Sequence, residues 1–136
     1  MPDMQSMTYA ASLAIATAAK TALAGAKLLL FKSGWQPTAG SVLADYAAHE
    51  ADFDGYGRVT VTAMLGPYLA LGGWSINTPL PQFTKAAGTN TNEIGGMALL
   101  DSTDKVWSYV VFDTPIVMSL EGQSIQRPMA LVFPVA

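Results

Sequence analysis

The sequence predicts a mainly β fold, an antiparallel β-sandwich or barrel with an α-helix at its N-terminus. Several short apolar or β-branched runs are separated by Gly, Pro and Asn turns, which is typical of antiparallel sheets. One Ala-rich stretch without Pro precedes them and predicts the helix. The 136 residues suit one domain with a substantial core. We divide the chain into an N-terminal helical arm, residues 1–24, and a β-rich domain, residues 25–136.

The predicted helix spans residues 10–24. Its apolar side chains recur near the helical period of 3.6 residues. Ser6 or Thr8 can cap its start, and Gly25 is well placed to end it. The stretch is weakly apolar on every side, which suits a helix packed between subunits or against a sheet. Lys20 interrupts it and no basic segment precedes it, so we expect neither a signal peptide nor a membrane span.

The first strand, residues 26–32, is apolar at nearly every position and is therefore expected to be covered on both faces. A run of alternating β-branched residues predicts a second strand, and two later runs joined by the turn 101–104 predict a hairpin. A further turn is expected at 121–123. The predicted elements after the first strand are a short helix at 41–48 and strands at 57–63, 68–71, 82–85, 94–100, 106–112, 115–120 and 128–135.

The composition indicates a protein that completes its burial against other chains. Only 12% of the residues are charged and 51% are apolar, whereas a typical soluble domain has about 25% charged residues. Large apolar surfaces that folding leaves exposed mark interaction sites. Seven Met residues add adaptable apolar surface. The side chains that we expect at a partner interface are Leu13, Ile15, Leu23, Trp35 and Trp74.

Charge and cysteine content restrict the function further. The net charge is −3 and the basic residues are scattered, so we expect no nucleic-acid partner. The chain has no Cys, which excludes disulfides, thiolate metal ligands and a thiol nucleophile. His49 is the only histidine, and no G-x-S-x-G elbow supplies a serine beside it. We therefore expect neither an enzyme nor a cofactor.

One acidic segment has partial metal-ligand spacing. Glu50, Asp52 and Asp54, followed by Gly55, match positions 1, 3, 5 and 6 of a calcium loop. Position 12 would need a bidentate acid but is Val61, so an EF-hand is excluded. The three acids remain weak candidates for a looser cation site. The alternative is a solvated acidic turn from which Phe53 and Tyr56 insert into the core.

Several segments together resemble a known group of proteins. They are 27–33 (KLLLFKS), 37–38 (PT), 41–46 (SVLADY), 50–56 (EADFDGY) and 94–101 (IGGMALLD). This pattern is similar to small β-rich structural proteins encoded by tailed phages, which include capsid cement (decoration) proteins. The chain departs from it at Gly95-Gly96, where an aromatic residue is often found. The resemblance covers about residues 20–120 and implies a structural protein of the virion, with the acidic turn as an architectural corner.

The expected function is that of a phage capsid cement protein. Such a protein would form a homotrimer, bind and stabilise the shell of the major capsid protein, and assemble in the host cytoplasm before residing on the capsid surface. A tail, fibre or head–tail component of the virion is the first alternative. The second is a carbohydrate-binding or hydrolytic virion module, which would require an aromatic-lined groove with converging acids. We expect no membrane partner.

Overall fold

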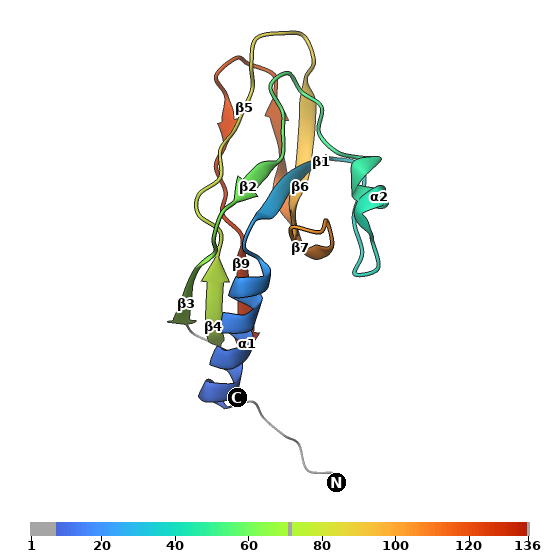
Figure 1. The fold of residues 1–136 in the computed structure, drawn as a ribbon. Helices are drawn as coiled ribbons and strands as arrows, with labels where there is room; N and C mark the ends of the chain where they lie inside the picture. The colour runs from blue at the N-terminus through green and yellow to red at the C-terminus, as the bar shows by residue number, and fades with distance from the viewer. Residues whose placement is uncertain (1–7, 71, 136) are drawn as a thin grey trace.

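The computed structural model describes residues 8–70 and 72–135, and its architecture is mainly β (Figure 1). The strands pair antiparallel in three sheets, and helix α1, Tyr9–Ala22, lies at one end. The predicted fold class is therefore confirmed. Among the described residues the sheets do not close into a barrel, and the arrangement is sandwich-like.

The largest sheet has four strands in the order β2-β1-β6-β7. β1 lies near its centre, and its bounds are those predicted from its continuous apolar run. The register places Leu29 opposite Ala98, and Ala98 opposite Tyr109. These side chains share one face of the sheet, because paired residues point the same way. The strands are β1 Ala26–Lys32, β2 Val59–Val61, β6 Asn92–Leu100 and β7 Val106–Met118.

Two smaller sheets complete the β structure. A three-stranded sheet has the order β3-β4-β9, and α1 packs against all three of its strands. A two-stranded sheet pairs β5 with β8. A short helix, α2, lies over the large sheet (Figure 1). The bounds are β3 Leu65–Ala70, β4 Gly73–Asn77, β5 Phe83–Thr84, β8 Ser124–Ile125, β9 Ala130–Pro134 and α2 Leu43–Ala47.

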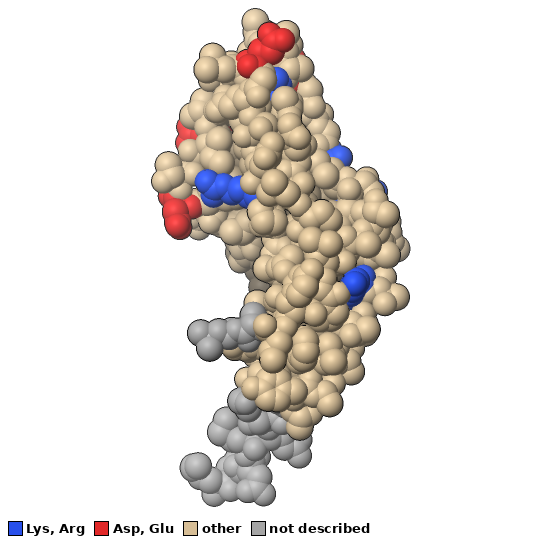
Figure 2. Space-filling view, turned by 90° about the vertical axis from the view of Figure 1, so that its left-hand side faces the viewer, with Lys and Arg blue, Asp and Glu red and all other residues tan. Residues whose placement is uncertain are grey.

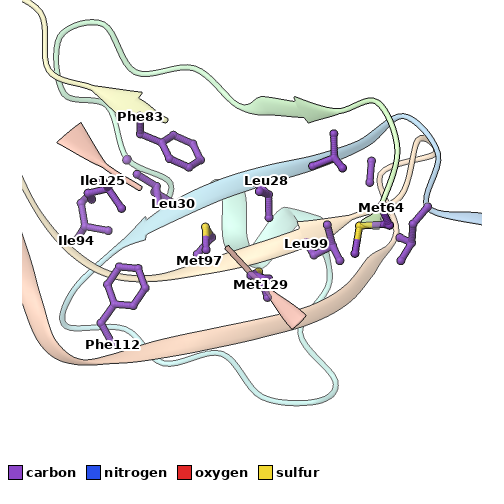
Figure 3. Close-up of a cluster of buried hydrophobic side chains, with 14 of the residues drawn as sticks. Leu28, Leu30, Met64, Phe83, Ile94, Met97, Leu99, Phe112, Ile125 and Met129 are labelled. Carbon is purple, nitrogen blue, oxygen red and sulfur yellow. The ribbon is translucent and has the colours of Figure 1, made fainter. Parts of the chain in front are cut away.

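The large sheet is buried on both faces, as the sequence of β1 predicts. On one face, Leu28 and Leu30 belong to the main core cluster (Figure 3). On the other, Leu29 and Phe31 form a second cluster with Tyr46 from α2. All five side chains are fully buried. Each buried side chain of this size contributes about 1.5–3 kcal/mol, so both faces of β1 stabilise the fold.

Helix α1 shares the main core with the strands. The hydroxyl of Thr8 accepts a hydrogen bond from the Ala11 N–H, which confirms one predicted cap; Ser6 lies outside the described residues. Gly25 has φ +73° just after the helix, a conformation that glycine adopts at low cost. The buried residues Ala16 and Leu23 lie in the same cluster as the β1 leucines. The described part of the N-terminal arm, residues 8–24, thus shares one core with the β-rich domain that we separated from it on sequence.

Three predictions about strands differ from the structure. The separate strands expected at 106–112 and 115–120 are one strand, β7, whose register with β6 shifts between Gly96 and Ile94. β4 and β8 were not expected. β4 begins at Gly73, a residue type that predicts a turn from sequence. In the structure the backbone of Phe133 lies where a Cβ of Gly73 would stand, so this position of the strand requires glycine.

Within the described residues, no helix has the length and hydropathy that crossing a membrane requires.

Candidate functional site: the acidic turn and the uncharged layer

The three acids of the predicted cation loop bind three different basic side chains. Glu50 pairs with Arg58 at 2.9 Å. Asp52 pairs with Lys32 at 3.3 Å, and Asp54 pairs with Lys85 at 3.5 Å. The three carboxylates, at alternate positions of the loop, therefore each bind a separate basic side chain and do not converge on one point. Within residues 8–70 and 72–135, no group of three or more His, Asp or Glu side chains gathers as metal ligands would.

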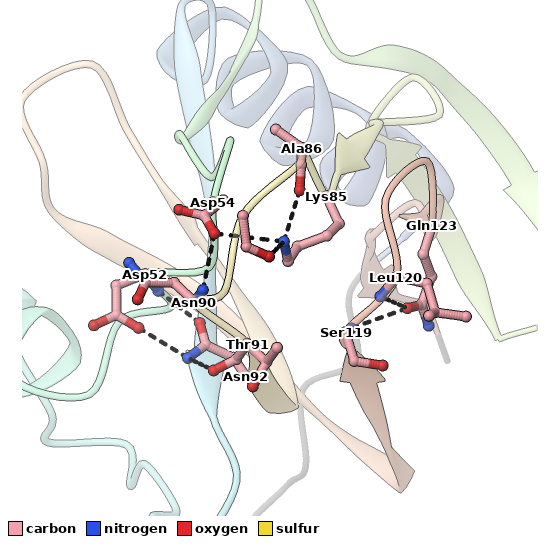
Figure 4. A network of polar contacts seen from close by, with 11 residues as sticks. Asp52, Asp54, Lys85, Ala86, Asn90, Thr91, Asn92, Ser119, Leu120 and Gln123 are labelled. Atoms are coloured by element: carbon pink, nitrogen blue, oxygen red, sulfur yellow. Dashed lines mark hydrogen bonds and ion pairs between the residues drawn. The ribbon is translucent and has the colours of Figure 1, made fainter.

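Asp54 fixes the loop 85–90 against the turn (Figure 4). Its Oδ2 accepts a hydrogen bond of 2.8 Å from the N–H of Asn90 and lies 3.5 Å from Nζ of Lys85. The lysine side chain is only 1% exposed, and its ammonium also donates to the carbonyls of Ala86 at 2.6 Å and Gly88 at 3.2 Å. A buried ammonium needs such partners. Asp54 thus acts as a structural corner.

Asp52 lies at the surface of the same turn (Figure 4). Its carboxylate accepts a hydrogen bond of 2.8 Å from the side-chain amide of Asn92, while its own N–H donates to Oδ1 of that residue at 2.7 Å. This hydrogen bond, together with the Lys32 ammonium, lowers the pKa of Asp52. The side chain is 69% exposed, so its ion pair contributes little to stability.

Glu50 and the aromatic side chains of the turn complete the corner. Phe53 is buried and Tyr56 packs against the main core cluster, as the alternative interpretation of this segment predicts. Burial raises the pKa of Tyr56, and so does its hydrogen bond to Glu50. Glu50 is largely shielded from solvent, so the segment is not the fully solvated turn that we considered.

His49 stacks on Trp35, which packs against the second cluster. Their rings stack with centroids 4.7 Å apart and planes 9° from parallel. The indole also meets Phe31 and Tyr46 edge to face, at 5.5 Å and 5.1 Å. Aromatic pairs of this geometry add stability beyond the area they bury. Trp35, which we expected at a partner interface, therefore packs half-buried against its own chain.

A second feature is a layer that is nearly free of charge, formed by α1, β3, β4 and β9, which we call the uncharged layer. Lys20 is its single charged residue, and the Lys20 ammonium donates to the carbonyl of Gly66 at 2.6 Å. Figure 2 shows this lower part of the molecule as almost entirely tan. Large apolar side chains are nevertheless exposed on it, namely Tyr9, Ile15, Leu65, Tyr68, Leu69 and Val132.

Of the residues predicted at a partner interface, Ile15 is the most exposed, at 45%. Leu13 is half-buried. Trp74 is also half-buried and donates from Nε1 to the carbonyl of Tyr9 at 3.1 Å. Leu23 is fully buried in the core and offers no surface to a partner. The sequence analysis missed the exposed side chains of β3 and β9, although no charged residue occurs in 59–84 or 128–136.

The uncharged layer can bind by burying apolar area and by strand pairing, rather than by attracting charge. β3 and β9 are the two edges of its sheet, and a sheet edge presents unpaired N–H and C=O groups to a partner. Comparisons with protein-family models, curated proteins and solved structures find no match for this chain.

Proposed function

We propose that this chain is a structural protein of a phage virion, a capsid cement protein that forms a homotrimer and stabilises the shell of the major capsid protein. The observation that carries this proposal is the uncharged layer. It combines exposed apolar side chains, two sheet edges and a single charged residue that is bound within the chain. The resemblance of the KLLLFKS and EADFDGY segments to tailed-phage structural proteins supports the same function.

The energetics of the layer suit a permanent assembly. A surface that lacks charged groups loses little hydration free energy when a partner covers it, whereas unpaired charges would oppose burial. A stable interface takes about 800 Å² from each partner, roughly a tenth of the 7643 Å² accessible surface of this chain. An interface of standard size would therefore cover only one end of the molecule, and the opposite end would stay exposed.

Charge substitutions in the layer test the proposal. Leu69 is 59% exposed on β3, so Leu69→Glu changes the surface and leaves the core intact. Leu120 is 70% exposed in a turn outside the layer, and Leu120→Glu is its matched control. We expect wild type and the control to sediment as trimers and to co-sediment with capsids that lack this protein. We expect Leu69→Glu to lose both properties while its circular dichroism spectrum remains unchanged.

Two outcomes contradict the proposal. Wild-type protein that stays monomeric and does not bind capsids would exclude the cement function. Trimers that form without binding capsids would indicate a tail, fibre or head–tail component instead.

A further inference from the structure

Three hollows lie between segment 33–46 and strand β7, and we call them together the groove. The third shares no lining residue with the other two. The first is about 560 Å³ and lies between 39–44 and 104–106; the last is about 230 Å³ and lies between 33–36 and 111–115. The middle hollow is about 270 Å³ and shares lining residues with the first. No residue of the groove belongs to the uncharged layer.

The middle hollow is bordered by a buried polar group without a partner. Tyr46 is fully buried, and its hydroxyl has no hydrogen-bond partner among the described residues. Tyr109 lies on the same face of the sheet and lines the same hollow. Burial raises the pKa of Tyr46 to about 12, with a contribution from Tyr109, so the hydroxyl stays protonated at neutral pH. An unsatisfied buried group costs about 1–3 kcal/mol, and a ligand oxygen recovers this cost when a small shift of the lining side chains exposes the Tyr46 hydroxyl to the hollow.

Apart from Ala39 and Val106, the other walls of the middle hollow are aromatic or hydroxylated. Trp107 and Tyr109 are 40% and 37% exposed, so both rings have surface left for a ligand. Nε1 of Trp107 donates to Oδ2 of Asp101 at 3.0 Å, which holds the indole in position. The remaining lining residues include Thr38, Ser41 and Ser108, and none of the lining residues is charged.

We propose that the middle hollow binds a neutral saccharide unit of a glycan chain that lies along the groove. A sugar ring has an apolar face that packs on aromatic rings and hydroxyls that exchange hydrogen bonds with Ser, Thr and Tyr. Charged residues line only the two ends of the groove, with Asp104 and Lys105 at one end and Asp113 at the other. The uncharged middle therefore favours a neutral sugar over an acidic one.

The lining of the middle hollow favours a saccharide over a peptide. β7 is an edge strand of the large sheet, and a peptide that adds a strand would pair with the main chain of that edge. The middle hollow instead offers exposed aromatic rings and side-chain hydroxyls, which match the apolar face and the hydroxyls of a sugar ring. Ligand sites usually have about 300–1,000 Å³, and the middle hollow approaches this range before its neighbours are included.

Binding of soluble neutral oligosaccharides to the full chain tests this inference. The probes are glucan, mannan, galactan and N-acetylglucosamine oligomers. Their binding is measured by isothermal titration calorimetry and by changes in the NMR chemical shift of the Trp107 indole. Tyr46→Phe removes only the hydroxyl, and we expect it to weaken binding roughly tenfold, the worth of one hydrogen bond. Trp107→Ala should abolish binding. Tyr68→Phe removes a hydroxyl in the uncharged layer and should bind as wild type does.

The inference is overturned if none of these oligosaccharides binds, if Tyr46→Phe and Trp107→Ala both retain full affinity, or if only peptides bind in the groove. Circular dichroism and thermal unfolding of each variant establish that it is folded. The result is independent of the cement function, because the groove and the uncharged layer share no residue. A monomeric protein that binds sugar would support the groove and contradict the assembly.

Discussion

The carboxylate of Glu50 holds the guanidinium of Arg58 through two hydrogen bonds of 2.9 Å, from Nε and from Nη2. The hydroxyl of Tyr56 donates to the same carboxylate at 2.5 Å and accepts the N–H of Leu30 at 3.3 Å. The pair is thereby tied to the centre of the large sheet. Burial alone would raise the pKa of Glu50. The hydrogen bonds from Arg58 and Tyr56 together lower this pKa by more than burial raises it, so the net shift is downward.

This relationship predicts a loss of stability in acid. A carboxyl whose pKa is lowered by folding stabilises the protein above its unfolded pKa, about 4.3 for Glu. That contribution disappears as the pH falls through the lower pKa of the folded state. We expect the free energy of unfolding, measured with urea, to decrease from about pH 5 downward. Glu50→Gln should be less stable than wild type at pH 7 and should show a weaker decrease; an identical pH dependence would contradict this assignment.

Asp54 and Asp52 should differ in their importance. Asp54→Ala leaves the buried ammonium of Lys85 without its carboxylate and should lower the free energy of unfolding by about 1–3 kcal/mol. Asp52→Ala removes an exposed ion pair and should cost less than about 1 kcal/mol. Both effects should be the same with calcium and with a chelator. A calcium-dependent rise in the melting temperature that Asp54→Ala abolishes would instead support the cation site.

Gly96 should tolerate no side chain. A Cβ there would collide with the ring of Phe31 and with the carbonyl oxygen of Val110. Gly96→Ala should therefore lower the free energy of unfolding by about 1–3 kcal/mol, the usual cost of overpacking. Gly57→Ala is the control, because a Cβ at Gly57 meets no atom within 4 Å. Equal stabilities of the two variants in urea unfolding would refute this packing account.

Leu23 and Ile15 separate folding from assembly within one segment. Leu23 is fully buried, so Leu23→Ala should cost about 2–5 kcal/mol. Ile15 is exposed on the uncharged layer, so Ile15→Ala should change the stability of the monomer by less than about 0.5 kcal/mol. The same Ile15 variant should weaken self-association in sedimentation equilibrium. If association were unchanged, α1 would not belong to the interface.

The sequence predicts elements whose signals are local. The predicted bounds of β1 are correct because its apolar run reflects burial on both faces. Thr8 and Gly25 mark the two ends of α1, because capping and positive backbone angles depend on the residue type at those positions. β4 was missed because Gly73 not only closes the turn after β3 but also begins a strand, where it packs closely against β9, a strand distant in sequence. Close approaches of that kind leave no local pattern.

The candidate sites were predicted less well, for the same reason. The spacing of Glu50, Asp52 and Asp54 says nothing of Lys32 or Lys85, which the fold brings to them from other elements. The uncharged layer likewise combines α1 with two distant uncharged stretches, 59–84 and 128–136. A search for long segments without charged residues would have found the exposed residues of the uncharged layer. The basic partners of Glu50, Asp52 and Asp54, in contrast, can be identified only from the structure.

The number of copies of this chain in a virion tests the central claim most directly. It is measured by quantitative mass spectrometry of virions purified from cells that carry the gene for this chain, with the major capsid protein as the internal reference. A cement protein predicts a ratio near one, or a large fixed fraction of one, to the major capsid protein. A few copies or tens of copies per particle would place the chain in the tail, a fibre or the head–tail connection, and its absence would contradict a structural function in the virion.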